Sequence, residues 1–119
     1  MRERNVNVLV VDDQKAIRDT LQTALDDEGF TVECAANGQE ALDILRHWKP
    51  CVILLDLMMP VMDGWAFQAE QRRSGSTVPI VLLSAAGELG KHQAALGAAA
   101  VIAKPFDIDN VISAIEGVC

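Results

Sequence analysis

The stretch "ILLDLMMP", residues 53–60, places a carboxylate at the end of an apolar run. The run begins at Cys51 and is continuously hydrophobic, a pattern typical of a central parallel strand covered by helices on both faces. It ends at Asp56, and burying a carboxylate there is unfavourable unless other charges or hydrogen bonds replace the lost water. The sequence therefore predicts that further polar groups converge on Asp56.

Short apolar runs and helical periodicities alternate along the rest of the chain. Strands are expected at 6–11, 31–35, 51–56, 79–85 and 99–103. Helices are expected at 15–28, from Asn37 to a stop before Pro50, at 65–73, at 87–96 with weak periodicity, and after Asp107. Five strand and helix units with short connections predict an α/β fold with a doubly wound, five-stranded parallel sheet and helices on both faces. The 119 residues, 1–119, are expected to form one domain.

Composition narrows the possible partners and the location. Seventeen acidic residues against ten Lys and Arg give a net charge of −7, which argues against direct binding to nucleic acid. The longest apolar stretch, "AALGAAAVIA" at 94–103, is about half the ~20 residues that a membrane helix requires. The N-terminal "MRERNVNVLVVDD" lacks the apolar core of a signal peptide. A cytoplasmic protein without membrane contact is expected.

The cysteines and histidines show no pattern of a metal site. Cys34, Cys51 and Cys119 are odd in number and lack metal-ligand spacing, so reduced structural thiols are expected. His47 and His92 are isolated in the sequence and are expected to be exposed, without a role as phosphodonors.

Polar residues stand where four of the five expected strands stop. Asp12 and Asp13 follow the first strand, Asp56 ends the third, Ser84 lies in the fourth and Lys104 follows the fifth. The carboxyl ends of parallel strands form the functional edge of a doubly wound sheet. Three carboxylates at one edge repel one another unless a cation neutralises them, and Mg²⁺ prefers such oxygen ligands. The pattern predicts a magnesium site with a lysine able to bind a phosphate oxygen.

These residues together resemble the receiver domain of response regulators in two-component signalling. The resemblance covers essentially the whole chain, and its motifs are Asp12-Asp13, Asp56, Pro60 and Gly64 in the following loop, Ser84, and Lys104-Pro105. It implies a flavodoxin-like strand order of 2-1-3-4-5. It also implies a regulatory phosphoacceptor domain rather than a dedicated enzyme.

The resemblance assigns the acidic residues to phosphoryl and metal binding. Asp56 matches the phosphoacceptor of the family, and Asp12 and Asp13 match the acidic pair that binds Mg²⁺ directly or through water. Met58 matches the position whose backbone carbonyl completes the metal shell. The metal ligands implied are thus Asp12, Asp13, Asp56 and the Met58 carbonyl.

The remaining motifs imply phosphoryl binding and switching. Ser84 matches the hydroxyl residue that hydrogen-bonds the phosphoryl group, and Lys104 matches the phosphate-binding lysine, with a cis bond to Pro105. Val101 stands where the family often has a Tyr or Phe whose rotamer changes on activation, so an aromatic switch cannot operate there. The implied partners are a histidine kinase or histidine phosphotransfer protein as phosphodonor and a downstream protein target.

Other classes with this architecture fit less well. A flavodoxin-like electron carrier would have Thr, Ser and Gly rather than Asp12-Asp13 in its phosphate loop. A haloacid-dehalogenase-type phosphatase would have a second Asp at Met58, and Ser84 lacks the flanking glycines of a hydrolase nucleophile. Within the receiver family, the alternative to a stand-alone domain is a receiver module excised from a longer regulator with a separate output domain.

Overall fold

The computed structural model describes the backbone of residues 4–85 and 89–119, and the side chains of 4–84 and 92–119. Strands and helices alternate strictly along the chain. The strands are β1 (Asn7–Val11), β2 (Thr31–Ala35), β3 (Val52–Asp56), β4 (Ile80–Ala85) and β5 (Ala100–Lys104). The helices are α1 (Lys15–Asp27), α2 (Gly38–Leu45), α3 (Gly64–Arg73), α4 (Leu89–Leu96) and α5 (Ile108–Val118).

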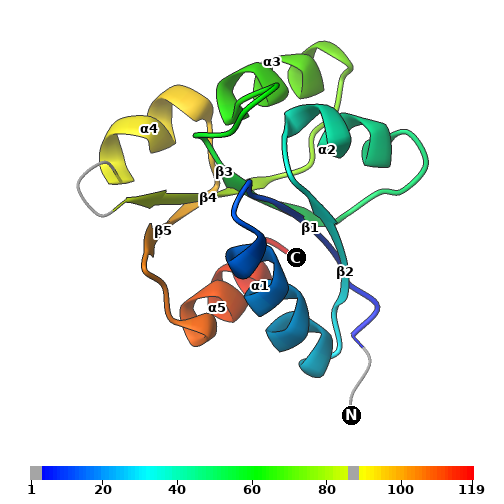
Figure 1. Ribbon diagram of the computed structural model, residues 1–119, viewed down its shortest axis with the longest axis vertical. Coiled ribbons are helices and arrows are strands. Elements are labelled where there is room, and N and C mark those ends of the chain that lie inside the picture. The colour runs from blue at the N-terminus through cyan, green and yellow to red at the C-terminus, as the bar shows by residue number, and fades with distance from the viewer. Residues whose placement is uncertain (1–3, 86–88) are drawn as a thin grey trace.

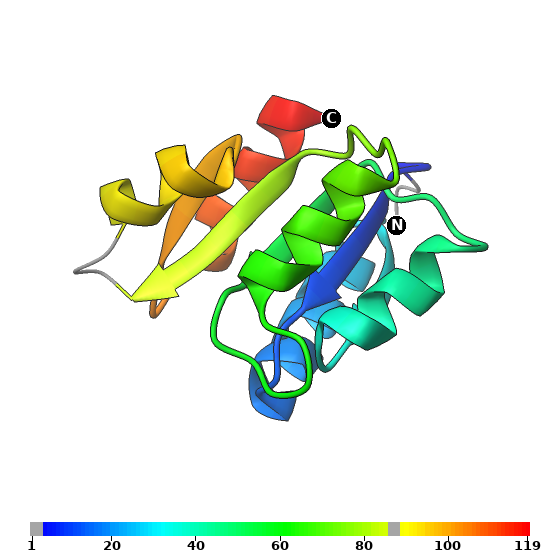
Figure 2. The ribbon, with the colours of Figure 1, turned by 90° about the horizontal axis from the view of Figure 1, so that it is seen from above.

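The five strands form one parallel sheet in the order β2-β1-β3-β4-β5. Helices α1 and α5 cover one face, and α2, α3 and α4 cover the other (Figures 1 and 2). The doubly wound fold and the strand order 2-1-3-4-5 are therefore confirmed. None of the helices in the described part of the chain is long and apolar enough to span a membrane.

The hydrophobic pattern of β3 follows from its central position. Val52 and Leu54 pack with side chains of α1 and α5, whereas Ile53 and Leu55 pack with those of α2 and α3. All four are fully buried. Because successive side chains of a strand point to opposite faces, a strand covered on both faces must be apolar at every position.

Helix ends follow the expected local chemistry. Asn37 caps α2 by accepting a hydrogen bond from the Glu40 backbone at 2.9 Å, and the Glu40 carboxylate accepts one from the backbone of Ala36, the residue before the cap. Asp107 caps α5, as expected. Helix α4 is described only from Leu89, and the start of the expected helix at 87 lies outside the described residues.

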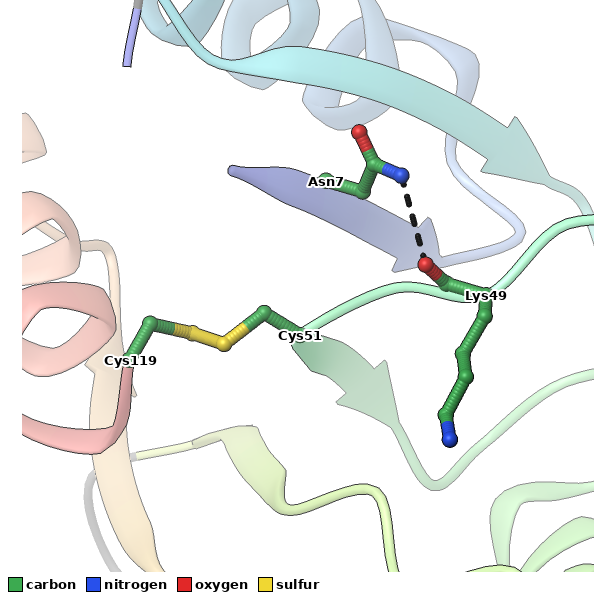
Figure 3. The surroundings of a disulfide bond; sticks show 4 residues. All are labelled: Asn7, Lys49, Cys51 and Cys119. Atoms are coloured by element: carbon green, nitrogen blue, oxygen red, sulfur yellow. Dashed lines mark hydrogen bonds between the residues drawn. A yellow bond between two sulfur atoms is a disulfide. The ribbon is translucent and has the colours of Figure 1, made fainter. Parts of the chain in front are cut away.

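The expectation of three reduced thiols is wrong, because Cys51 and Cys119 form a disulfide (Figure 3). Their Cα atoms are 6.0 Å apart although 68 positions separate them in the sequence. Helix α5 returns toward the amino ends of the strands, so Cys119, which follows its last residue, meets Cys51, which precedes β3. Sequence spacing alone does not reveal this contact. Cys34 is free and half-buried, and burial raises the pKa of its thiol to about 11.

Candidate functional site

Three carboxylates lie together at the carboxyl ends of β1 and β3. One oxygen from each of Asp12, Asp13 and Asp56 can be chosen so that all lie within 4.8 Å of one another. Val11 pairs with Leu55 in the sheet, so the next residues, Asp12 and Asp56, are neighbours at the same edge. Asp12 is fully buried, Asp56 is 8% exposed and Asp13 is exposed. The predicted convergence of polar groups on Asp56 is present.

The lysine at the end of β5 reaches this cluster. Its Nζ lies 2.9 Å from Asp12 Oδ2 and 3.6 Å from Asp56 Oδ2, although β3 and β4 separate β1 from β5. Lys104 is the last residue of β5, one position beyond the expected end of this strand. The Lys104-Pro105 peptide bond is cis, as the family resemblance implied. Lys104 therefore supplies positive charge to two of the three carboxylates.

Asp12 is fixed by hydrogen bonds from several directions. Its Oδ1 accepts from the backbone N–H of Gln14 at 2.9 Å, and its backbone carbonyl accepts from Arg18 Nη1 at 2.7 Å. Its own N–H donates to the carbonyl of Ala35 at 3.1 Å. Sequence reasoning missed Gln14 and Arg18. An Asp two residues before the N-cap of a helix signals the first contact, but nothing in the sequence distinguishes Arg18 from other surface cations.

The environment of Asp56 opposes its ionisation. Burial raises the pKa of Asp56, and the neighbouring Asp12 and Asp13 add to the rise, whereas Lys104 and a 3.3 Å hydrogen bond from the Met58 N–H lower it. Loss of water is the largest cause. The carboxylate is therefore placed where additional positive charge would stabilise its ionised form.

The loop after β3 closes tightly above Asp56. Gly64 donates its N–H to the Leu57 carbonyl at 2.9 Å. A Cβ on Gly64 would lie 2.8 Å from the Asp56 carbonyl oxygen, so only glycine allows this approach. Val61 has a φ of 68°, which is unusual for a β-branched residue, and its side chain is 83% exposed. Met58 is 79% exposed, so its side chain leaves the cluster open.

Two other residues named from the sequence lie near this edge. Ser84 is 8% exposed near the end of β4, one position beyond the residue that pairs with Asp56. Val101 is half-buried in β5 and packs against the core on the α2 and α3 side. Both residues lie in the strands that the sequence predicted for them.

The expectation of two exposed histidines holds only for His47. His92 is half-buried, and its ring makes an edge-to-face contact with Trp65, with 5.4 Å between ring centroids and an interplanar angle of 87°. The contact joins α3 to α4. It depends on tertiary packing that the sequence pattern does not indicate.

The cluster fits a hard divalent cation. Its candidate ligands are carboxylate oxygens, without histidine or cysteine among them, and this donor set suits Mg²⁺ rather than a softer metal. Within the described residues, Asp13 makes no hydrogen bond or ion pair through its carboxylate. Asp12 and Asp56 already share Lys104, so Asp13 is the least compensated of the three.

Comparisons with known proteins agree with the site. A family profile for the response regulator receiver domain matches residues 8–116. Response regulator MprA of Mycolicibacterium vanbaalenii is 36% identical over 110 residues, which cover 91% of this chain and 48% of that protein. The chain spans about half the length of the curated relatives it matches.

Solved structures give the same result. The receiver domain of Francisella response regulator 1452 superposes with a TM-score of 0.88 at 30% identity, covering 96% of both chains. Chemotaxis response regulator CheY4 of Vibrio cholerae superposes with a TM-score of 0.84 at 34% identity, covering 96% of this chain and 98% of that one. The likeness extends over nearly the whole fold, including the strands that carry the acidic cluster.

Proposed function

The chain belongs to the response-regulator receiver family, and on that premise we propose that Asp56 accepts a phosphoryl group. The donor is a histidine kinase or a histidine phosphotransfer protein. The observation that carries this proposal is the meeting of Asp12, Asp13 and Lys104 with Asp56 at one sheet edge. Among the described residues, Asp56 is the one carboxylate that is itself the last residue of a strand, and it lies beside Asp12, Asp13 and Lys104.

The proposed reaction is an in-line displacement at phosphorus. A carboxylate oxygen of Asp56 forms a bond to phosphorus while the bond from phosphorus to the donor nitrogen breaks, which leaves an acyl phosphate on Asp56. Lys104 Nζ lies 3.6 Å from Asp56 Oδ2, close enough to bind an oxygen of the transferred phosphoryl group in place of that carboxylate. Ser84 would donate its hydroxyl to the transferred group. Positioning and electrostatics supply nearly all of the rate enhancement in this mechanism.

The same residues are proposed to bind Mg²⁺. Asp12, Asp13, Asp56 and the backbone carbonyl of Met58 would be its protein ligands. When bound, the ion would neutralise charge on the phosphoryl oxygens. The raised pKa of Asp56 supports this assignment, because a carboxylate destabilised by burial gains most from an added cation.

The experiment uses acetyl phosphate as donor and intact mass as readout. Wild type should gain one phosphoryl group with Mg²⁺ and none with EDTA, and Asp56→Asn should gain none. Asp63→Asn is the matched control, because Asp63 caps α3 outside the cluster and Asn caps a helix equally well. Labelling of Asp56→Asn at wild-type stoichiometry would refute the assignment.

Phosphorylation is further proposed to change a protein-binding surface rather than to start a catalytic cycle. With Val101 in place of an aromatic residue, the change would pass through Ser84 and the segment that follows it. Amide exchange with and without a beryllofluoride phosphate mimic tests this route, and unchanged protection from 85 to 96 would contradict it.

The organisation of the whole protein is also a proposal. Residues 1–119 would form one receiver domain that acts in the cytoplasm and contacts neither nucleic acid nor membrane directly. The alternative is a receiver module of a longer regulator. The match covers only 48% of MprA, which is consistent with this alternative. The size of the endogenous protein on an immunoblot distinguishes the two.

A further inference from the structure

The disulfide lies at the opposite end of the sheet from the acidic cluster, and one of its two cysteines is exposed. Cys51 precedes the first residue of β3, whereas Asp56 is the last residue of that strand. Figure 3 shows the bond joining the end of α5 to the start of β3. Cys119 is exposed and Cys51 is half-buried. Because thiol–disulfide exchange depends on access to a sulfur, an attacking thiolate from solvent reaches Cys119 more readily than Cys51.

Hydrogen bonds hold Cys51 in place independently of the S–S bond. Its N–H donates to the Asn7 carbonyl at 2.8 Å, next to the pairing of β3 with β1. The Asn7 side chain in turn donates to the carbonyl of Lys49 at 3.3 Å, so the chain that enters β3 is also fixed before Cys51 (Figure 3). Opening the disulfide removes neither of these bonds.

Helix α5 is likewise anchored by contacts other than the disulfide. Val111 and Ile115 are fully buried in the core. The Glu116 carboxylate accepts a hydrogen bond from Arg4 Nη1 at 2.7 Å, and the N–H of Cys119 donates to the Ile115 carbonyl at 2.9 Å. Reduction should therefore leave two thiols close together on a folded scaffold, where the bond between them can form again.

The third cysteine, Cys34, is poorly placed to exchange with this pair. In the sheet it is level with Leu54, three positions beyond Cys51, and it lies two strands away in β2. Three positions correspond to about 10 Å along the strands. Burial raises the pKa of the Cys34 thiol to about 11, so only about one molecule in 10⁴ carries its thiolate near neutral pH. Oxidation is therefore confined to one pairing.

We propose that Cys51 and Cys119 form a reversible thiol–disulfide exchange site for a low-molecular-weight thiol, with Cys119 as the sulfur that the thiol attacks. A thiolate RS⁻ forms a bond to Cys119 Sγ while the S–S bond breaks, and the electron pair leaves on Cys51 Sγ, which takes up a proton. A second RS⁻ attacks the R-bearing sulfur of the mixed disulfide, which releases RSSR and leaves Cys119 as a thiol after protonation. Two thiols are thereby oxidised to one disulfide while the protein disulfide is reduced to a dithiol.

Reduction would loosen the last turn of α5. This turn contains Gly117, and a Cβ there would meet no atom within 4 Å, so little packing holds the turn at this position. Glycine also weakens a helix. Disulfides of cytosolic proteins are usually transient and redox-sensing, and the location proposed above would place this pair among them. The pair would then report the redox state of the surrounding thiols by fastening or releasing the end of α5.

The first test is a titration of the wild-type full chain with mixtures of reduced and oxidised glutathione near neutral pH. Free thiols are counted by intact mass after acid quenching and alkylation. The count should change between one, Cys34, and three in a single step, with the same midpoint from both directions. Circular dichroism should show a folded chain throughout, and amide exchange should quicken mainly at 116–119 and at the start of β3.

The rate of reduction distinguishes local exchange from global unfolding. It should rise linearly with glutathione concentration and stay nearly constant when urea is added below the unfolding transition. Oxidised glutathione should form a mixed disulfide on Cys119 in Cys51→Ser about tenfold or more faster than on Cys51 in Cys119→Ser. The matched control carries both substitutions and retains Cys34 alone, and it should form almost no mixed disulfide.

Several outcomes would overturn the proposal. They are reduction that unfolds the chain, reduction that oxidised glutathione does not reverse, and a reduction rate that climbs steeply with urea. Equal or faster modification of Cys51, or modification centred on Cys34, would also overturn it. The titration and its urea dependence use wild type alone, so they remain decisive if a serine variant fails to fold.

Discussion

The disulfide between Cys51 and Cys119 should contribute a large share of the stability of this fold under oxidising conditions. The perturbation is Cys51→Ser or Cys119→Ser, compared with wild type before and after reduction. Either substitution opens a loop whose ends are 68 positions apart. The loop includes β3, β4 and β5, so it restrains most of the sheet in the unfolded chain.

The magnitude follows from the entropy of loop closure. For a loop of this length the chain-entropy relation gives about 4 kcal/mol of stabilisation near room temperature. This is close to the upper end of measured values, about 2–5 kcal/mol for native disulfides. A domain of ordinary stability, about 5–15 kcal/mol, would therefore lose a substantial fraction of its free energy of unfolding.

The assay is urea unfolding followed by far-ultraviolet circular dichroism, with and without dithiothreitol. Reduction should lower the midpoint for wild type, and both serine variants should match reduced wild type regardless of reductant. Cys34→Ser is the control, because Cys34 is outside the disulfide and should leave the response to reductant intact. A wild-type midpoint that is insensitive to reductant, or three free thiols in the oxidised native protein, would refute the reasoning.

Three further perturbations test the local arguments. Asp56→Asn should raise the free energy of unfolding in metal-free buffer near neutral pH, but it should not do so at about pH 3. Burial raises the pKa of Asp56, so its ionised form destabilises the fold only at pH values above the ordinary pKa range of Asp. Equal effects at both pH values in denaturant titrations would contradict this. Gly64→Ala should lower the free energy of unfolding by about 1–3 kcal/mol, because its Cβ would lie 2.8 Å from backbone atoms. Gly117→Ala has no atom within 4 Å of the new Cβ and should be neutral or stabilising by up to about 1 kcal/mol. Similar losses for both variants in chemical unfolding would count against the predicted close contact at Gly64. Arg72→Met should lower the free energy of unfolding by about 1 kcal/mol, because Arg72 donates a hydrogen bond at 2.5 Å to the Leu96 carbonyl at the end of α4. Arg73→Met should lower it by less, because the ion pair of Arg73 with Glu70 is exposed. Thermal unfolding compares them, and a larger loss for Arg73→Met would reverse the argument.

The fold was predictable because its local signals agree with one another. The cap at Asn37 with Glu40 three residues later, the cap at Asp107 and the continuous apolar pattern of β3 each indicate the same alternation of elements. Strand bounds shifted by a single position at several ends. The shift that matters most for the site is at the end of β5. This strand includes Lys104, whose side chain reaches the cluster.

The candidate site was predictable only in part. Asp12, Asp13, Asp56 and Lys104 converge because parallel strands bring their carboxyl ends to one edge, which is a property of topology that the sequence indicates. Contacts set by side-chain packing were not predictable from the residues alone. Examples are the bond from Arg18 to the Asp12 carbonyl, the Trp65 and His92 contact, and the disulfide.

The central claim is that Asp56 is the residue that carries the phosphoryl group. The most direct measurement is to phosphorylate the full chain with acetyl phosphate and Mg²⁺, to trap the acyl phosphate with hydroxylamine, and to locate the resulting hydroxamate by fragmentation of proteolytic peptides. The account predicts a single hydroxamate at Asp56, absent when EDTA or the Asp56→Asn substitution is used. A hydroxamate at Asp12, Asp13 or Asp63 with Asp56 unmodified would contradict it.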